Sequence, residues 1–378
     1  MGIKGLATLI KRDRTTVKLQ GTGKYVVVDA MWWFHHSGSR KNELINGLEL
    51  IVFFLAMGVV PIFCFDGKTP TNKQHIVERR FARRAKKTNS PNIATRYSYQ
   101  PSRQIIDEFK EMCDAMGIPC ITAQYEADAQ MAKMSCELDG CVGVLTGDTD
   151  VLVHGGTMIS WQQNTNYVEH YTVATALDMI NQRIRELATQ CAVLGAKYTG
   201  VDLGRAHLID LAVLWGTDYS SGLRGAVELA RSLGMLCDQN DLSDGNVLGA
   251  THQNAVLGLY VYYGMCIDTL IRETRCSQSL ARQIYSARQE YTGPIVRDID
   301  HVELKRRAPC VDWIRSIISN HIAIESIDDV IGLCETSWER INTWQCVAPT
   351  LPVQSTAPTP TPRPRNQMPK KFPKYPSR

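Results

Sequence analysis

Paired cysteines are the first feature that the sequence lacks. Its 12 cysteines are scattered without a C-x-x-C pair, and several, among them Cys64, Cys141 and Cys191, lie inside apolar runs. A free cysteine in such a run behaves as a small hydrophobic residue. Because disulfides are uncommon in reducing compartments, we expect an intracellular protein with reduced thiols, neither secreted nor held by a disulfide framework.

Targeting and membrane segments are also missing. The first residues do not predict a secretory leader, and Leu6 stands where the myristoylation pattern needs serine or threonine. The longest apolar stretch, residues 48–65, contains Glu49, Gly58 and Pro61. It therefore predicts helix, turn and strand rather than a membrane span, and no membrane partner is expected.

Positive charge is scarce in the body of the chain. The net charge is +4, but residues 349–378 carry six basic residues and no acid, which leaves 36 basic and 38 acidic residues elsewhere. Nine of the 16 prolines lie in the same C-terminal stretch, so residues 348–378 predict a disordered, basic, proline-rich tail. Nucleic-acid binding by the body would then depend on local basic patches.

Acidic residues follow apolar segments at several points. Asp29 follows residues 25–28, Asp66 follows residues 59–65, Asp148 and Asp150 follow residues 142–145, and Asp218 follows residues 208–215. The first three segments predict buried strands, and the fourth predicts a helix or buried segment. Glu126 and Asp128 fall at the first turn of a further predicted helix, where anions are favoured. The plainer interpretation of each acid alone is capping of a turn or helix.

Together, the seven acids favour a metal site over capping. The carboxyl ends of parallel strands meet at one edge of a sheet, which is where ligand sites of open α/β sheets gather. Carboxylates crowded there without lysine or arginine partners repel one another unless cations lie between them. Oxygen ligands favour Mg²⁺, with Mn²⁺ as a substitute, and no histidine and cysteine set suits zinc. Two such ions are the usual apparatus for in-line attack on a phosphodiester.

A strongly basic segment lies between two of these acids. Residues 73–87 hold seven basic residues against Glu78 alone, and their few apolar positions predict a helix. A solvated surface helix usually mixes both signs of charge. The imbalance therefore favours contact with a phosphate backbone. Residues 88–100 are polar and predict a loop.

Six segments in order resemble the flap endonuclease/XPG family of structure-specific 5′ nucleases. They are residues 1–6 (MGIKGL), 26–29 (VVVD), 65–68 (FDGK), 125–130 (YEADAQ), 147–150 (GDTD) and 215–219 (WGTDY). Each motif alone is weak evidence, but their order and spacing agree from residue 1 to about residue 235. Residues 125–130 and 33–36 (WFHH) are similar to the exonuclease-one branch, and the short, divergent chain suits a viral or otherwise streamlined member.

The resemblance implies a fold, an activity and a role for particular residues. The fold would be a PIN-like α/β nuclease fold, with a mostly parallel central sheet flanked by helices and a helical hairpin in the C-terminal part. The activity would be metal-dependent hydrolysis of phosphodiesters at 5′ flaps or 5′ ends of DNA, leaving a 5′-phosphate and a 3′-hydroxyl. The ligands of two Mg²⁺ ions, or residues bonded to those ligands, would be Asp29, Asp66, Glu126, Asp128, Asp148, Asp150 and Asp218.

Catalytic and nucleic-acid-binding residues follow from the same resemblance. Lys73 and Arg80 would steer the scissile phosphate and stabilise the transition state. Residues expected to contact nucleic acid are Gly2, His35, Arg79, Arg83, Arg84, Ser221 and Arg224. His35 is equally well interpreted as a partly buried structural histidine.

Two departures from the family pattern bear on the substrate. The family's glycine-rich hairpin holds a potassium ion against duplex phosphate, but Val227 stands here where a glycine is expected after Gly222 and Gly225. The interval between Asp66 and Glu126 is short and polar, which argues against a full helical arch. The tail has no recognisable sliding-clamp motif.

Three functions remain open from the sequence. The first is a DNA nuclease in replication, repair or recombination, acting as a monomer in the nucleus or another DNA-replication compartment. The second is an RNA endonuclease of the same fold that degrades messenger RNA. The third is an inactive scaffold that binds branched DNA, which the presence of all seven acids argues against.

Four regions are predicted along the chain. Residues 1–110 form an N-terminal nuclease region with the basic helix 73–87, and residues 111–235 form an internal nuclease region with the helical hairpin. Residues 236–347 form a helical C-terminal region, and residues 348–378 form the tail.

Overall fold

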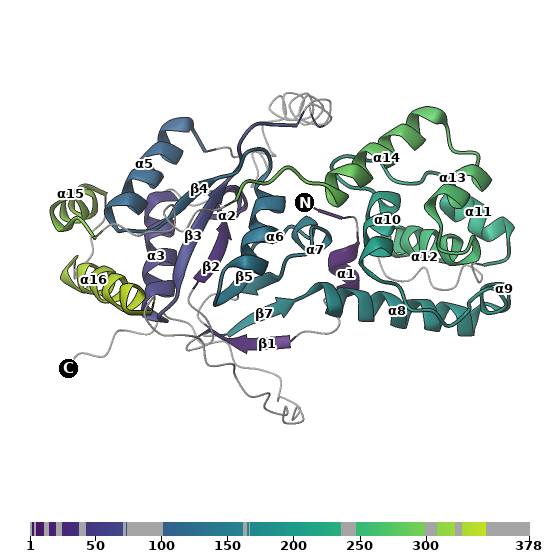
Figure 1. Cartoon of the computed structure of the whole chain (residues 1–378), viewed down its shortest axis with the longest axis horizontal. Helices are drawn as coiled ribbons and strands as arrows, with labels where there is room; N and C mark the ends of the chain where they lie inside the picture. Colours follow the sequence, from purple (N-terminus) through teal and green to yellow (C-terminus); the bar gives the residue numbers. More distant parts are fainter. Residues whose placement is uncertain are drawn as a thin grey trace.

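A computed structural model of the chain describes residues 2–3, 5–10, 15–19, 25–37, 43–70, 73, 101–161, 165, 167–235, 247–298, 308–321 and 327–344. Figure 1 shows a sheet with its covering helices on one side of the molecule and an all-helical part, α8 to α14, on the other. The C-terminal helices α15 (Val311–His321) and α16 (Ile327–Trp344) return to the sheet side.

The central sheet has seven strands in the order β1-β7-β6-β5-β2-β3-β4. They are β1 (Thr15–Lys18), β2 (Tyr25–Asp29), β3 (Val60–Phe65), β4 (Cys120–Thr122), β5 (Cys141–Leu145), β6 (Met158–Trp161) and β7 (Tyr167–Tyr171). The neighbours from β6 to β4 pair in parallel, whereas β7 runs antiparallel to both β6 and β1. The sheet is therefore mostly parallel, as predicted, with an antiparallel edge that the sequence analysis missed.

Helices cover both faces of the parallel strands. Val26 and Val28 of β2 pack into a core shared with α2 (Ala30–Ser37), α3 (Glu43–Ala56) and α5 (Arg103–Ala115), and buried residues of α15 and α16 join this core. Val27 faces the opposite side, against α6 (Ala127–Glu137). The alternation follows from the two-residue period of a strand.

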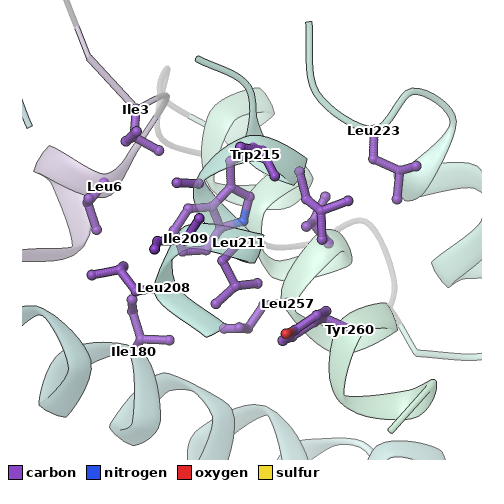
Figure 2. Close-up of a cluster of buried hydrophobic side chains, with 14 of the residues drawn as sticks. Ile3, Leu6, Ile180, Leu208, Ile209, Leu211, Trp215, Leu223, Leu257 and Tyr260 are labelled. Carbon is purple, nitrogen blue, oxygen red and sulfur yellow. The ribbon is translucent and has the colours of Figure 1, made fainter. Parts of the chain in front are cut away.

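The helical part has its own core around Trp215, the last residue of α10 (Arg205–Trp215). Figure 2 shows Leu208, Leu211 and Trp215 packed among residues of neighbouring helices, with Ile3 and Leu6 at the same cluster. The helices of this part are α8 (Val173–Gln190), α9 (Ala192–Gly195), α11 (Ala226–Ser232), α12 (Val247–Tyr262), α13 (Ile267–Glu273) and α14 (Gln278–Thr292). Two short helices, α1 (Leu6–Ile10) and α7 (Asp150–Val153), join this core to the sheet.

The predicted strands 25–28, 59–65 and 142–145 are confirmed. Residues 208–215, for which a helix or a buried segment was predicted, belong to helix α10. Helix α5 begins after its N-cap Ser102, whose side chain accepts a hydrogen bond from the Ile105 amide. The basic helix after Lys73, the loop 88–100 and the tail lie outside the described residues.

No single helix in the described part of the chain is long and apolar enough to cross a membrane, although the bent pair 252–262 and 267–273 meets those two criteria together.

Candidate active site

The parallel strands place four carboxylates at one edge of the sheet. β2 ends with Asp29, Asp66 follows β3 directly, and Asp148 and Asp150 follow β5. From β2 the chain continues to β3 on one side of it and later to β5 on the other, so the strand order changes direction at β2. The crevice at such a switch point is where open α/β sheets bind ligands.

Two further acids come from the start of α6. Glu126 occupies the N-cap position but makes no capping bond with its side chain, and Asp128 lies in the first turn. The Glu126 carboxylate accepts hydrogen bonds from Lys73 Nζ and from the Tyr219 hydroxyl instead. Helix capping therefore does not account for Glu126.

Asp218 comes from the loop between α10 and α11. Thr217 Oγ1 accepts hydrogen bonds from the amides of Tyr219 and Ser220, which closes a tight turn around Asp218. This turn directs Asp218 towards Lys73, whose Nζ lies 3.5 Å from Asp218 Oδ2. We call the seven carboxylates of this edge the acid rim; its members are Asp29, Asp66, Glu126, Asp128, Asp148, Asp150 and Asp218.

Lys73 is buried between two members of the acid rim. Its Nζ is 2.5 Å from Glu126 Oε2 and 4.9 Å from the centre of the Tyr219 ring. Burial alone would lower the pKa of Lys73, but the carboxylates of Glu126 and Asp218 outweigh it and raise the pKa. The expectation that the acids lack a basic partner is therefore wrong for Glu126 and Asp218.

The other five carboxylates form no ion pair with a lysine or arginine in the described part of the chain. Burial raises the pKa of Asp29 to about 7, and the charges of Asp66 and Asp148 add to the effect. Burial also raises the pKa of Asp128 well above its ordinary value, with contributions from Asp148, Asp29, Asp150 and Asp66. The pKa values of Asp148 and Asp150 rise for the same two reasons, and that of Asp66 rises through desolvation of its carboxylate and the charges of Glu126 and Asp148. These five acids thus lie close enough to destabilise one another's charge.

Hydrogen bonds hold these acids in fixed directions. Asp29 accepts from the Trp32 amide at 2.9 Å and from Thr146 Oγ1 at 2.8 Å. Asp66 accepts from the Ala127 amide at 2.9 Å, and Asp148 from the Asp150 amide at 3.1 Å. Asp150 Oδ1, in contrast, is buried without a hydrogen-bond partner.

The donor set and the unpartnered oxygen fit a divalent cation. Clustered carboxylate oxygens are the ligands that Mg²⁺ and Mn²⁺ prefer. Within the described residues, however, no three acidic, histidine or cysteine side chains already converge at metal-ligand spacing. A divalent cation would therefore have to bring the carboxylates closer together, and its charge would offset the repulsion that raises their pKa values.

Of the predicted nucleic-acid contacts, Gly2 lies beside the rim and His35 lies in α2, the helix after β2. A Cβ atom on Gly2 would come within 2.4 Å of Asp148 Oδ1, so only glycine fits this position, and the Ile3 amide donates to Thr149 Oγ1. His35 is half-buried in α2. The next histidine, His36, is exposed and stacks on Trp32, with ring centres 4.9 Å apart. Trp32 in turn lies against Gly147, directly before Asp148.

The remaining predicted contacts divide into two groups. Ser221 and Arg224 are exposed in the loop before α11, so both are accessible to a ligand. Their role in binding stays a prediction. The arginines of the predicted basic helix lie outside the described residues: Arg79, Arg80, Arg83 and Arg84.

Three residues of the site were missed by the sequence analysis: Tyr219, His154 and Tyr291. Tyr219 was quoted in a motif without a role, although it follows Asp218 directly. His154 and Tyr291 have ring centres 4.8 Å apart next to Asp150. Burial, with the charges of Arg205 and Lys73, lowers the pKa of His154 to about 3. No pattern in the sequence predicts that residue 291 contacts residue 150.

Two family models match the chain. The XPG N-terminal domain matches residues 1–87, and the XPG I-region matches residues 117–218. Every acid of the rim lies within one of these two matches.

Curated relatives agree with the family models. The chain is 30% identical over 251 residues to a flap endonuclease 1 from Methanosphaerula palustris, a match that covers 60% of this chain and 72% of the relative. It is 28% identical to flap endonuclease 1 from Cryptosporidium parvum, covering 60% of this chain and 52% of that protein. The chain belongs to the flap endonuclease/XPG family. It spans little more than half the length of several curated relatives that it matches.

Solved structures show the same PIN-like nuclease fold. The catalytic core of Rad2 in complex with DNA substrate aligns with a TM-score of 0.57 at 21% identity, covering 88% of this chain and 100% of that one. The Holliday junction-resolving enzyme GEN1, in complex with product DNA and Mg²⁺ and Mn²⁺ ions, aligns with a TM-score of 0.52 at 14% identity, covering 91% of this chain and 80% of that one.

Proposed function

We propose that the protein is a metal-dependent, structure-specific 5′ nuclease that hydrolyses phosphodiesters of DNA at 5′ flaps or 5′ ends. The observation that carries this proposal is the convergence of the acid rim from separate parts of the chain onto one edge of the sheet, together with Lys73. A structural role alone would not require so many clustered carboxylates. Three of them, Asp29, Asp148 and Asp150, are buried, and a buried charge costs free energy unless it is paired.

The rim divides into two halves with different charge balance. Glu126 and Asp218 share one cation, Lys73, whereas Asp29, Asp66, Asp128, Asp148 and Asp150 form no ion pair among the described residues. We propose that the second half holds two Mg²⁺ ions, which Mn²⁺ can replace. Ions bound there would supply the positive charge that stabilises a phosphorane-like transition state and lowers the pKa of an attacking water.

The chain's own groups would position the substrate. Lys73 Nζ lies on the rim and has donors beyond those used by Glu126 and Asp218, so it can contact a phosphate oxygen that approaches the five acids. A positioned ammonium group stabilises the negative charge that develops in the transition state. Arg80 would serve the same purpose from the basic segment.

Support for a DNA substrate comes from the exposed hairpin and from the relatives. Arg224 and Ser221 lie on the surface of the loop that also carries Asp218, so a duplex held by this loop would place its phosphates near the rim. Matched relatives are called flap endonuclease 1, and the Rad2 structure holds a DNA substrate. We propose that the protein acts as a monomer on such DNA, in the nucleus or another compartment of DNA replication.

The test is cleavage of end-labelled substrates with Mg²⁺. Double-flap, nicked and blunt duplex DNA, and single-stranded RNA of the same sequence, are compared at equal concentration. We expect cuts at the flap junction or 5′ end of the DNA, and none with Asp148→Ala. Faster cleavage of the RNA would instead support an RNA endonuclease with the same site.

A binding measurement separates an enzyme from a scaffold. Calorimetric titration with Mn²⁺ should show binding by the wild type that Asp148→Ala and Asp150→Ala abolish or weaken. Branched-DNA binding with neither Mn²⁺ binding nor cleavage would refute the proposal and support an inactive scaffold.

A further inference from the structure

The last turn of helix α14, in the helical part of the molecule, contacts the acid rim. Tyr291 is fully buried, and its hydroxyl donates a hydrogen bond of 2.9 Å to Asp150 Oδ2. The two residues are 141 positions apart, and Tyr291 lies outside both matched family models. A segment outside the matched regions therefore contacts a carboxylate inside them.

This hydrogen bond determines how the Asp150 carboxylate is oriented. Asp150 is 3% exposed, and its other oxygen, Oδ1, is buried without a partner. Tyr291 is thus the hydrogen-bond donor that the described structure provides to this carboxylate. With Oδ2 fixed by Tyr291, Oδ1 stays available as a ligand.

The Tyr291 ring is itself held in place by neighbours at the rim. It meets the Tyr219 ring edge to face at 5.8 Å and lies 4.8 Å from the ring of His154. The Tyr219 hydroxyl donates to Glu126. The two tyrosines therefore connect the helical part of the molecule to two acids on different elements.

The chain after Tyr291 makes a second connection to the rim. Gln130 of α6 is fully buried. Its Nε2 donates a hydrogen bond of 3.1 Å to the Arg297 carbonyl, and its Oε1 accepts one of 3.0 Å from the Arg297 amide. Asp128 lies two residues before Gln130 in the same helix. The segment from Tyr291 to Arg297 thus joins α14 to the helix that carries Asp128, which restrains the position of the Tyr291 ring.

We propose that Tyr291 is a positioning residue that orients Asp150 for binding a divalent cation. The inference rests on the proposed function, since it assigns Asp150 to the metal-binding half of the rim. Hydrogen bonds to metal ligands fix the orientation of those ligands, and losing one typically costs about 10- to 100-fold in metal affinity.

The test compares Tyr291→Phe with a matched variant of another buried tyrosine. Tyr260 is also fully buried and donates a hydrogen bond, at 2.8 Å, to an aspartate, Asp210. It lies in the core of the helical part (Figure 2), and its partner is not a member of the rim. Mn²⁺ affinity is measured by calorimetry on the full chain. We expect Tyr291→Phe to weaken it about 10-fold or more and Tyr260→Phe to leave it unchanged.

A double-mutant cycle gives a second measurement. In an Asp150→Asn background, Tyr291→Phe should cause little further loss of Mn²⁺ affinity, because its effect acts through Asp150. Equal Mn²⁺ affinity of wild type and Tyr291→Phe, or an additive loss in the double variant, would overturn the inference and leave the proposed function standing. Failure of Tyr291→Phe to fold, where Tyr260→Phe folds, would overturn it as well, since the bond would then be structural. Absence of Mn²⁺ binding by the wild type would refute the proposed function itself.

Discussion

At the scale of single residues, Lys73 distinguishes the two halves of the acid rim. Replacing it with alanine removes the positive charge between Glu126 and Asp218. We expect cleavage to fall roughly 100-fold, because a transition-state contact is lost. We expect Mn²⁺ affinity to hold or rise, because the rim loses a competing cation. Single-turnover cleavage and calorimetry measure the two effects.

Lys133→Ala is the control for this prediction. Lys133 pairs with Glu137 and Asp298, neither of which belongs to the rim. Both measurements should match the wild type for this variant. If Lys73→Ala lost cleavage and Mn²⁺ affinity in parallel, Lys73 would be holding the site in its folded arrangement and would not act by contacting the substrate phosphate.

His154 makes the stability of the protein depend on pH. Burial, together with Arg205 and Lys73, lowers its pKa to about 3, against about 6.5 in an unfolded chain. Below pH 6.5 the unfolded chain takes up a proton that the folded protein does not, so stability is lost as pH falls. Between about pH 7.5 and about pH 5, the wild type should lose about 1–2 kcal/mol more than His154→Gln. Urea unfolding at both pH values measures this; equal losses would contradict a buried neutral histidine.

At the scale of elements, the loop between α10 and α11 determines where Asp218 lies. Gly222 has a φ of +79°, and a Cβ there would come within 2.7 Å of the Trp215 carbonyl oxygen. Gly222→Ala should therefore destabilise the protein by about 2 kcal/mol or more and reduce cleavage by displacing Asp218. Chemical denaturation and flap cleavage measure the two effects.

Gly225 provides the matched comparison in the same loop. Its φ is +73°, but a Cβ atom added there would meet no atom of a more distant residue within 4 Å. Gly225→Ala therefore meets only the backbone cost of about 1 kcal/mol. A larger effect at Gly225 than at Gly222 would contradict the idea that packing against Trp215 sets this loop.

Sequence patterns predict elements well where burial is continuous and poorly at edges. The strand β3 is buried at every position, so its apolar run is readable, and Asp66 follows from it. The edge strand β1 has a mostly exposed pattern that no apolar run marks. Partners such as Lys73 for Asp218, or Tyr291 for Asp150, arise from the packing of the helical part against the sheet, which local sequence does not encode.

At the scale of the whole molecule, the acid rim lies where the sheet and the helical part meet. The sheet side contributes Asp29 and Asp66, and the loop between α10 and α11 contributes Asp218. Lys73, Tyr219 and Tyr291 connect the two parts through acids of the rim. The stability of the whole protein should therefore depend on the charge state of the rim.

In the absence of metal, the raised pKa of Asp29 should make the protein less stable as pH rises. Burial and the charges of Asp66 and Asp148 raise the pKa of Asp29 to about 7, against about 3.9 in an unfolded chain. Between these values the folded protein binds the proton more tightly than the unfolded chain does. The contribution of Asp29 to the free energy of unfolding is therefore present at low pH. It is lost as pH rises from about 4 to about 7, a change on the order of 2 kcal/mol or more.

Divalent cations should reverse this loss. We expect the free energy of unfolding in EDTA to fall from about pH 5.5 to about pH 8 by more in the wild type than in Asp29→Asn, and Mg²⁺ to restore it at the higher pH in the wild type, since ligand binding to the folded state adds stability. Asp178→Asn, which removes an exposed acid of α8, should follow the wild type at every pH. If the free energy of unfolding of wild type and Asp29→Asn changed equally with pH in EDTA, the Asp29 carboxylate would not be buried among other acids. The convergence of acids on which the proposed metal site depends would then be refuted.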